Sequence, residues 1–167
     1  STATGVNIGF HEHASLLALE VFERFTSVSG LSGVTIDVAY VSLYGQAGSG
    51  SPLTKIRAND AAAPVAPTTT AEFNALVVTT AGVDWDAALT ANVFNDSPSL
   101  VAVIQELADS FDPSAIQILH FNDGATTTNY QSCRQYDQIS TQAAKLHIEY
   151  TAGGANTKRS QAILIGG

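Results

Sequence analysis

Residues 144–151 show the strictest alternation in the chain, and its period is that of a β-strand. Polar and apolar side chains follow one another in the order Lys145, Leu146, His147, Ile148, Glu149, Tyr150. Successive side chains of a strand point to opposite faces of its sheet, so one face is predicted to be buried and the other solvated. Such a strand needs partner strands beside it and a second layer of structure over its apolar face.

Most of the other apolar segments are also short, rich in β-branched residues and bounded by turn residues. Residues 34–44 (VTIDVAYVSLY) predict the longest strand, with the even-numbered residues on one face and the odd-numbered residues on the other. Residues 16–25 fit either a strand or a short helix, and the turn-rich residues that follow favour the strand. Further strands are predicted over residues 53–58, 73–80, 83–85 and 115–121.

One α-helix is predicted, over about residues 98–109. Ser97 is a natural N-cap residue, and Pro98 suits the first helical position. The apolar residues that recur at helical spacing are Leu100, Val101, Val103, Ile104, Leu107 and Ala108. Many short strands with a single short helix predict an all-β fold, either a β-sandwich or a jelly roll.

The composition limits what this sandwich can bind. The 167 residues include 15 acidic and 7 basic side chains, a net charge of −8, which argues against a nucleic-acid partner because such binding depends on clustered Lys and Arg. No apolar run approaches the roughly 20 residues that span a bilayer. The single cysteine, Cys133, excludes a disulfide framework within the chain and a multi-cysteine metal site.

The two ends of the chain are predicted to be arms on a central domain. The predicted division is 1–19 as an N-terminal arm or first strand, 20–151 as the jelly-roll domain, and 152–167 as a C-terminal arm. Residues 151–157 are flexible by composition, and the apolar run that follows is expected either to fold back as a last strand or to pair with a neighbouring subunit. The residues expected to mediate assembly are Ile8, Phe10, Ile163, Leu164 and Ile165.

Several segments of the central domain follow one another in a recognisable order. They are Arg24-Phe25-Thr26, Gly33-Val34-Thr35-Ile36, Ile56-Arg57-Ala58-Asn59-Asp60, Thr79-Thr80-Ala81-Gly82-Val83-Asp84-Trp85, Ser97-Pro98-Ser99-Leu100 and Tyr136-Asp137. Together they resemble a jelly-roll module, akin to DNRLRE-type and carbohydrate-binding-like domains, that recurs in bacteriophage and metagenomic structural proteins. The resemblance implies a β-sandwich in an assembly or adhesion setting, and it assigns no functional residues. The chain departs from the family at Phe111-Asp112-Pro113-Ser114, where the family has a Trp and a Gly-Asn pair.

Two groups of residues raise the hypothesis of a metal site. His11 and His13 would point to the same side of a strand, but no third ligand stands at a matching spacing. Oxygen ligands for a structural Ca²⁺ are offered by Asn59-Asp60, Asn95-Asp96, Asn122-Asp123 and Asp137, although these residue types are also common turn formers. We therefore expect no metal at the histidines and no resident cofactor, with a structural Ca²⁺ as the alternative for the loops.

The aromatic residues and the cysteine raise two further hypotheses. Trp85 and Tyr130 are candidates for a platform that stacks on a sugar ring, although for Trp85 core packing is the favoured interpretation. No Gly-x-Ser-x-Gly elbow is present and Cys133 has no histidine beside it in the sequence, so no catalytic residue is predicted. A pair of carboxylates stays open because a sequence does not give their separation.

The leading functional hypothesis is a non-enzymatic structural protein on the surface of a tailed-phage virion, specifically a capsid decoration (cement) protein. Its expected partners are copies of itself, as a trimer, and a capsid or other virion protein, without nucleic acid or membrane. The alternative hypothesis is an extracellular carbohydrate-binding or adhesion module of a secreted protein, a phage tail or fibre, or a filament, with a glycan as ligand. A hydrolase that uses an unrecognised carboxylate pair is the third.

Overall fold

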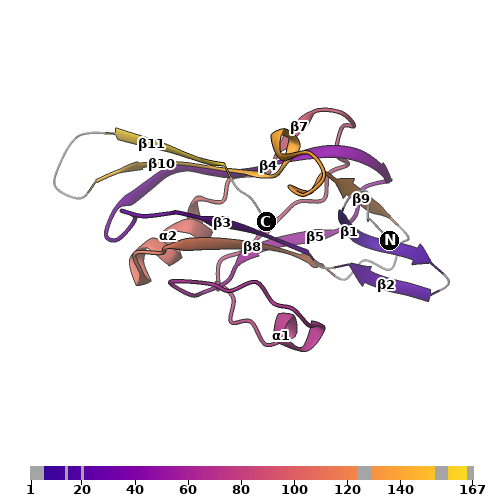
Figure 1. Cartoon of the computed structure of the whole chain (residues 1–167), viewed down its shortest axis with the longest axis horizontal. Helices are drawn as coiled ribbons and strands as arrows, with labels where there is room; N and C mark the ends of the chain where they lie inside the picture. Colours follow the sequence, from indigo (N-terminus) through magenta and orange to yellow (C-terminus); the bar gives the residue numbers. More distant parts are fainter. Residues whose placement is uncertain (1–5, 14, 20, 124–128, 153–157, 165–167) are drawn as a thin grey trace.

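In the part of the chain that the structure describes, two antiparallel β-sheets face each other and two short α-helices pack against them (Figure 1). The computed structural model describes residues 6–13, 15–19, 21–123, 129–152 and 158–164, with side chains over 21–123 and 129–152 except 47 and 49. The predominance of antiparallel strands confirms the predicted all-β class. None of the helices in this described part has the length and apolar content needed to cross a bilayer.

The larger sheet is built around β4, which is long enough to pair with two strands along one edge. Its strands are β1 (Val6–His13), β2 (Ser15–Leu19), β4 (Thr35–Ser49), β7 (Phe94–Asp96), β9 (Tyr130–Cys133), β10 (Lys145–Thr151) and β11 (Lys158–Leu164). The order is β11-β10-β4-β9-β1-β2, and β7 pairs with β4 from its other edge. β10 pairs with the first half of β4 and β9 pairs with the second half. Both strands therefore lie along the same edge of β4.

The smaller sheet has the order β3-β8-β5-β6. Its inner strand β8 is covered on both faces. Its strands are β3 (Val21–Thr26), β5 (Thr54–Ala58), β6 (Val83–Asp84) and β8 (Ala115–Asn122). The inner face packs on the larger sheet, and the helix α1 (Thr70–Asn74) lies on the outer face (Figure 1). There Phe73 lies between Phe22 and Phe121, with ring centroids 6.4 and 5.9 Å apart. Because both faces are covered, residues 115–120 are all buried.

The predicted helix is present as α2 (Val101–Ser110), but it begins differently from the prediction. Leu100 is the N-cap residue, and no side chain caps the helix. The Ser97 hydroxyl instead accepts a hydrogen bond from the backbone N–H of Val41 at 3.1 Å and donates one to the carbonyl of Pro98 at 2.8 Å. The predicted cap role of Ser97 was therefore wrong, because the tertiary contact with β4 takes its hydroxyl.

The prediction of a single helix and of a strand over residues 73–80 was also wrong. α1 ends at Asn74, a 3₁₀ turn occupies Ser140–Gln142, and Val78 makes only an isolated bridge to Asn59. α1 is fixed by a capping box: the Thr69 side chain accepts from the N–H of Glu72 at 3.2 Å, and the Glu72 carboxylate accepts from Thr68. These bonds to Thr68 lower the pKa of Glu72. The Thr-x-x-Glu pattern was the sequence signal for this helix.

β4 contains a register shift that changes which side chains are buried. Glu149 is opposite Val38 and Tyr150 is opposite Ile36, so Asp37 is an extra residue in β4. Ile36 is buried before the bulge, and Ala39 is buried after it, whereas Val38 is 36% exposed. The predicted even–odd division of residues 34–44 therefore fails beyond Asp37, because one inserted residue reverses the faces.

Candidate functional site

The terminal segments form the outer strands of the larger sheet. β1 pairs with β9 from Val6 opposite Cys133 to Gly9 opposite Tyr130, and its other edge pairs with β2. β11 pairs with β10 along its whole length, from Leu164 opposite Lys145. The C-terminal segment thus returns to its own chain as the last strand in this single copy.

The residues predicted to mediate assembly are distributed over these two strands. Ile8 and Phe10 lie on β1, and Ile163 and Leu164 lie on β11, while Ile165 lies outside the described residues. The side chains of β1, β2 and β11 are outside the described part of the chain, so only their backbone positions are defined. Those positions place β2 and β11 at edges of the larger sheet.

β1 and β11 continue one another along the same side of β9 and β10. Because β9 and β10 both run antiparallel to β4, the strands paired with them share a direction. The end of β11 therefore lies toward the beginning of β1, and residues 134–144 separate the two ladders. β11 and β1 thus lie end to end in one row of the sheet.

The described core beneath this row comes from the central part of the chain. Among the side chains that the structure describes, every member of the buried apolar cluster lies between Phe25 and Tyr150. On β10, Leu146, Ile148 and Tyr150 point into this cluster, and the residues between them are half-buried. β10 is thus firmly packed on the core, and its outer edge is the edge that pairs with β11.

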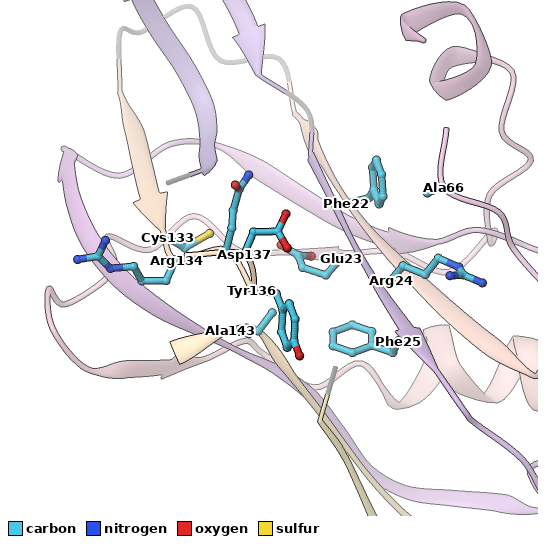
Figure 2. A pocket seen from close by; sticks show the side chains of 12 residues that line it. Phe22, Glu23, Arg24, Phe25, Ala66, Cys133, Arg134, Tyr136, Asp137 and Ala143 are labelled. Atoms are coloured by element: carbon cyan, nitrogen blue, oxygen red, sulfur yellow. The ribbon is translucent and has the colours of Figure 1, made fainter. Parts of the chain in front are cut away.

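A cleft of about 310 Å³ opens between β3 and residues 133–144, beside the meeting point of β11 and β1. Its apolar walls include Phe22, Phe25 and Tyr136, and its polar groups include Glu23 and Asp137. Figure 2 shows the rings of Phe25 and Tyr136 facing the same space. Tyr136 is 45% exposed, so the cleft offers an accessible aromatic ring close to carboxylates.

A buried polar group lies below this cleft. The Nε2 atom of His120 is 2.9 Å from the Glu23 carboxylate, and the His120 ring is fully buried, 6.2 Å from the ring of Trp85. Burial raises the pKa of the Cys133 thiol, and the nearby charge of Glu23 adds to the increase. Cys133 is 2% exposed, and a thiol held protonated is a poor nucleophile.

The two residues predicted as a sugar platform are separated in the structure. Trp85 is 8% exposed and belongs to the core, and its backbone N–H donates to the carbonyl of Thr54 at 2.8 Å. A ring this buried offers no open face to a sugar. Tyr130 is half-buried at the start of β9. The exposed aromatic ring of the cleft, Tyr136, was missed, because its neighbours Phe22 and Phe25 are distant in sequence and no local pattern joins them.

Three of the residues considered as Ca²⁺ ligands are used in protein contacts. Asp96 accepts a hydrogen bond from Ser42, Asp123 pairs with Lys55 at 3.0 Å, and the Asn59 amide donates to Gln117 at 2.8 Å. Within the described residues, no three His, Cys, Asp or Glu side chains gather as a metal site would require. The side chains of His11 and His13 lie outside those residues.

Comparison of the chain with family models, with curated proteins and with solved structures gave no match.

Proposed function

We propose that this protein is a non-enzymatic structural subunit that assembles with copies of itself through its terminal strands. The observation that supports this most directly is the position of the terminal segments, which place β2 and β11 at the two edges of one sheet. An edge strand carries unpaired N–H and C=O groups, which template the addition of another chain. Natural proteins therefore use such edges for assembly by strand addition.

The setting that we propose is the surface of a tailed-phage capsid, where the protein would act as a decoration (cement) protein. The proposal includes a jelly-roll arrangement of the two sheets, since two packed antiparallel sheets are the layers from which that fold is built. A closed ring such as a trimer would bury edges that a single copy exposes. Bridging between neighbouring subunits follows from the same strand pairing.

Light scattering on three forms of the protein tests the assembly proposal. The forms are the full chain, a chain that begins at Ser15 and lacks β1, and a chain that ends at Thr151 and lacks β11. We expect an oligomer for the full chain and a smaller species for at least one truncated form, with circular dichroism showing that each remains folded. A full chain that stays monomeric, or oligomers that are unchanged by both truncations, would contradict the proposal.

The cleft supports glycan binding as a second candidate function. Ligand sites combine apolar and aromatic walls with a few polar groups, and here Tyr136 lies close to the Asp137 and Glu23 carboxylates. A glycan array on the wild-type protein and on Tyr136→Ala tests it, with Val65→Ala as a control because Val65 is also exposed. Signals lost only in Tyr136→Ala would support the candidate, and a blank array at millimolar glycan would remove it. Trp85→Ala is unsuitable as a probe, since it would damage the core.

A further inference from the structure

Two carboxylates line the cleft without a basic side chain paired to them. Glu23 comes from β3, and Asp137 comes from the segment that follows β9. Among the described residues, no Lys or Arg side chain forms an ion pair with either carboxylate. A carboxylate in a partly enclosed space attracts a cation more strongly than one on an open surface, because less water screens its charge. The cleft therefore favours a positively charged group.

The contact between Glu23 and His120 leaves the negative charge of Glu23 in place. His120 is fully buried, and its Nε2 atom lies 2.9 Å from Oε2 of Glu23. Its other ring nitrogen, Nδ1, has no hydrogen-bond partner among the described residues. A protonated ring would bury an unpaired N–H at Nδ1 together with a charge, whereas a neutral ring that donates from Nε2 leaves only an acceptor there. The neutral ring is favoured, and it does not compensate the carboxylate.

The two arginines of the cleft wall are directed elsewhere. Arg24 donates from its Nε to the carbonyl of Pro64 at 2.7 Å. Figure 2 shows the guanidinium groups of Arg24 and Arg134 pointing away from the Tyr136 ring, in opposite directions. The whole chain also carries a net charge of −8. The space beside Tyr136 is therefore negative both locally and by the overall charge of the protein.

The other lining residues favour a ring-shaped ligand that carries hydroxyl groups. Tyr136 is 45% exposed, whereas Phe25 is fully buried in the wall behind the cleft. An exposed aromatic ring offers its face both to an apolar surface, such as the C–H face of a sugar, and to a cation. The Gln135 amide also lines the cleft and can both donate to and accept from hydroxyl groups. A lysine side chain, with its aliphatic stem, would leave such an amide unused.

We infer that the cleft binds a cationic amino sugar, with the sugar ring against Tyr136 and the protonated amine toward Glu23 and Asp137. This inference rests on the glycan-binding candidate described above and names the class of its ligand. The amine would donate charge-assisted hydrogen bonds to the carboxylates, which are stronger than hydrogen bonds between neutral groups. Acetylation of the amine removes its charge, so the acetylated sugar should bind more weakly.

Isothermal titration calorimetry on the full chain tests this preference. The ligands are a trisaccharide of glucosamine, the matching trisaccharide of N-acetylglucosamine, and a lysine tripeptide with both ends blocked, which carries the same charge as the first. We expect the glucosamine trisaccharide to bind about tenfold more tightly than the acetylated one, the difference that loss of a hydrogen bond to a charged group produces. The lysine tripeptide should bind as weakly as the acetylated sugar.

A pair of charge-removing variants tests whether the cleft is the site. Asp137→Asn removes one carboxylate charge at an exposed position of the cleft and keeps the shape of the side chain. We expect it to weaken binding of the glucosamine trisaccharide about tenfold. Asp84→Asn makes the same change in net charge on β6, outside the cleft, and should leave binding unchanged. Circular dichroism shows that both variants are folded.

The outcomes separate this inference from the glycan-binding candidate. If the two trisaccharides bind equally and both signals are lost in Tyr136→Ala, the candidate stands and the amino-sugar inference is wrong. Equal binding of the lysine tripeptide would mean that charge alone is recognised, which also contradicts the inference. If neither trisaccharide binds at millimolar concentration, both fail. Tighter binding of the glucosamine trisaccharide that is weakened by Asp137→Asn but not by Asp84→Asn supports both.

Discussion

The two open sides of the sandwich differ in how completely the space between the sheets is filled. On the side where β4 meets β5, α2 fills the space between the sheets and buries Val103, Ile104 and Leu107 completely. On the side where β3 faces residues 133–144, the cleft of about 310 Å³ remains. The difference teaches that one continuous amphipathic segment closes a sandwich well, whereas walls from distant segments leave room for a ligand or partner.

Polar groups strengthen the closed side further. The Gln105 amide accepts a hydrogen bond from the N–H of Ile36 at 2.8 Å and donates one to the carbonyl of Val34 at 3.0 Å. The Glu106 carboxylate accepts from the N–H groups of Thr80 and Ala81 at 2.7 and 2.9 Å. α2 is thus bonded to β4 and to the loop before β6. Around the cleft, Arg24 uses its Nε to donate to the carbonyl of Pro64, away from the opening (Figure 2).

The largest effect is expected from truncating the centre of the closed side. Ile104→Ala removes a fully buried side chain and should lower the free energy of unfolding by about 3 kcal/mol, because it loses burial and leaves a cavity. Urea unfolding followed by circular dichroism measures this. Ala102→Ser, at an exposed position of the same helix, is the control and should change little. A loss for Ile104→Ala no greater than the control's would show that α2 does not close the core.

Adding volume compares the two sides directly. Ala108 lies on the buried face of α2 and is 1% exposed, so Ala108→Leu should cost about 2 kcal/mol by overpacking. Ala144 lines the cleft, so Ala144→Leu should find space and cost little. The measurement is again the free energy of unfolding. Equal costs for the two variants would mean that the cleft is as tightly packed as the closed side.

Removing one amide side chain from each side compares how much polar contacts stabilise the two sides. Gln105→Ala leaves the Ile36 N–H and the Val34 carbonyl without this partner and should cost about 1.5 kcal/mol. Gln135→Ala, on the cleft wall, is the matched substitution and should cost about 0.5 kcal/mol or less. Thermal unfolding of both variants, compared with the wild type, measures the difference. Similar losses would contradict the view that α2 is the anchored side.

The smallest effect concerns Cys133 and depends on pH. Burial raises the pKa of its thiol in the folded state, so its contribution to stability is present below the ordinary thiol pKa and is lost as the pH rises above it. Between pH 8 and 9.5 the free energy of unfolding of the wild type should fall by about 1 kcal/mol more than that of Cys133→Ala. Parallel pH profiles for the two proteins would show that the thiol is accessible to water in the folded state.

The elements that could be predicted from the sequence are those whose pattern is local. The alternation in residues 145–150 gave β10 with the correct faces, and the helical spacing of Val103, Ile104 and Leu107 gave α2. Both patterns follow from the geometry of a single element. The capping box at Thr69 is also a local signal, but the β-branched residues that follow it favour a strand, and the predicted strand therefore covered the end of α1.

The features of the candidate site could not be predicted in the same way. Trp85 follows a strand and lies beside two aspartates, which fits either a platform or the core, and only its contact with the buried His120 decides for the core. Ser97 has the sequence of an N-cap, yet the N–H of Val41 takes its hydroxyl. The cleft joins β3 to residues more than a hundred positions later, and no periodicity records such a pairing.

The sequence by itself determined that this chain forms antiparallel strands with one core-filling helix, because side-chain period and burial are linked within each element. The tertiary structure alone decided the faces of β4 beyond Asp37, since the bulge appears only when β4 is paired with β10. It also decided that β1 and β11 share one row of the larger sheet and that a cleft opens beside it. Those properties depend on contacts between distant segments, which form only when the chain has folded.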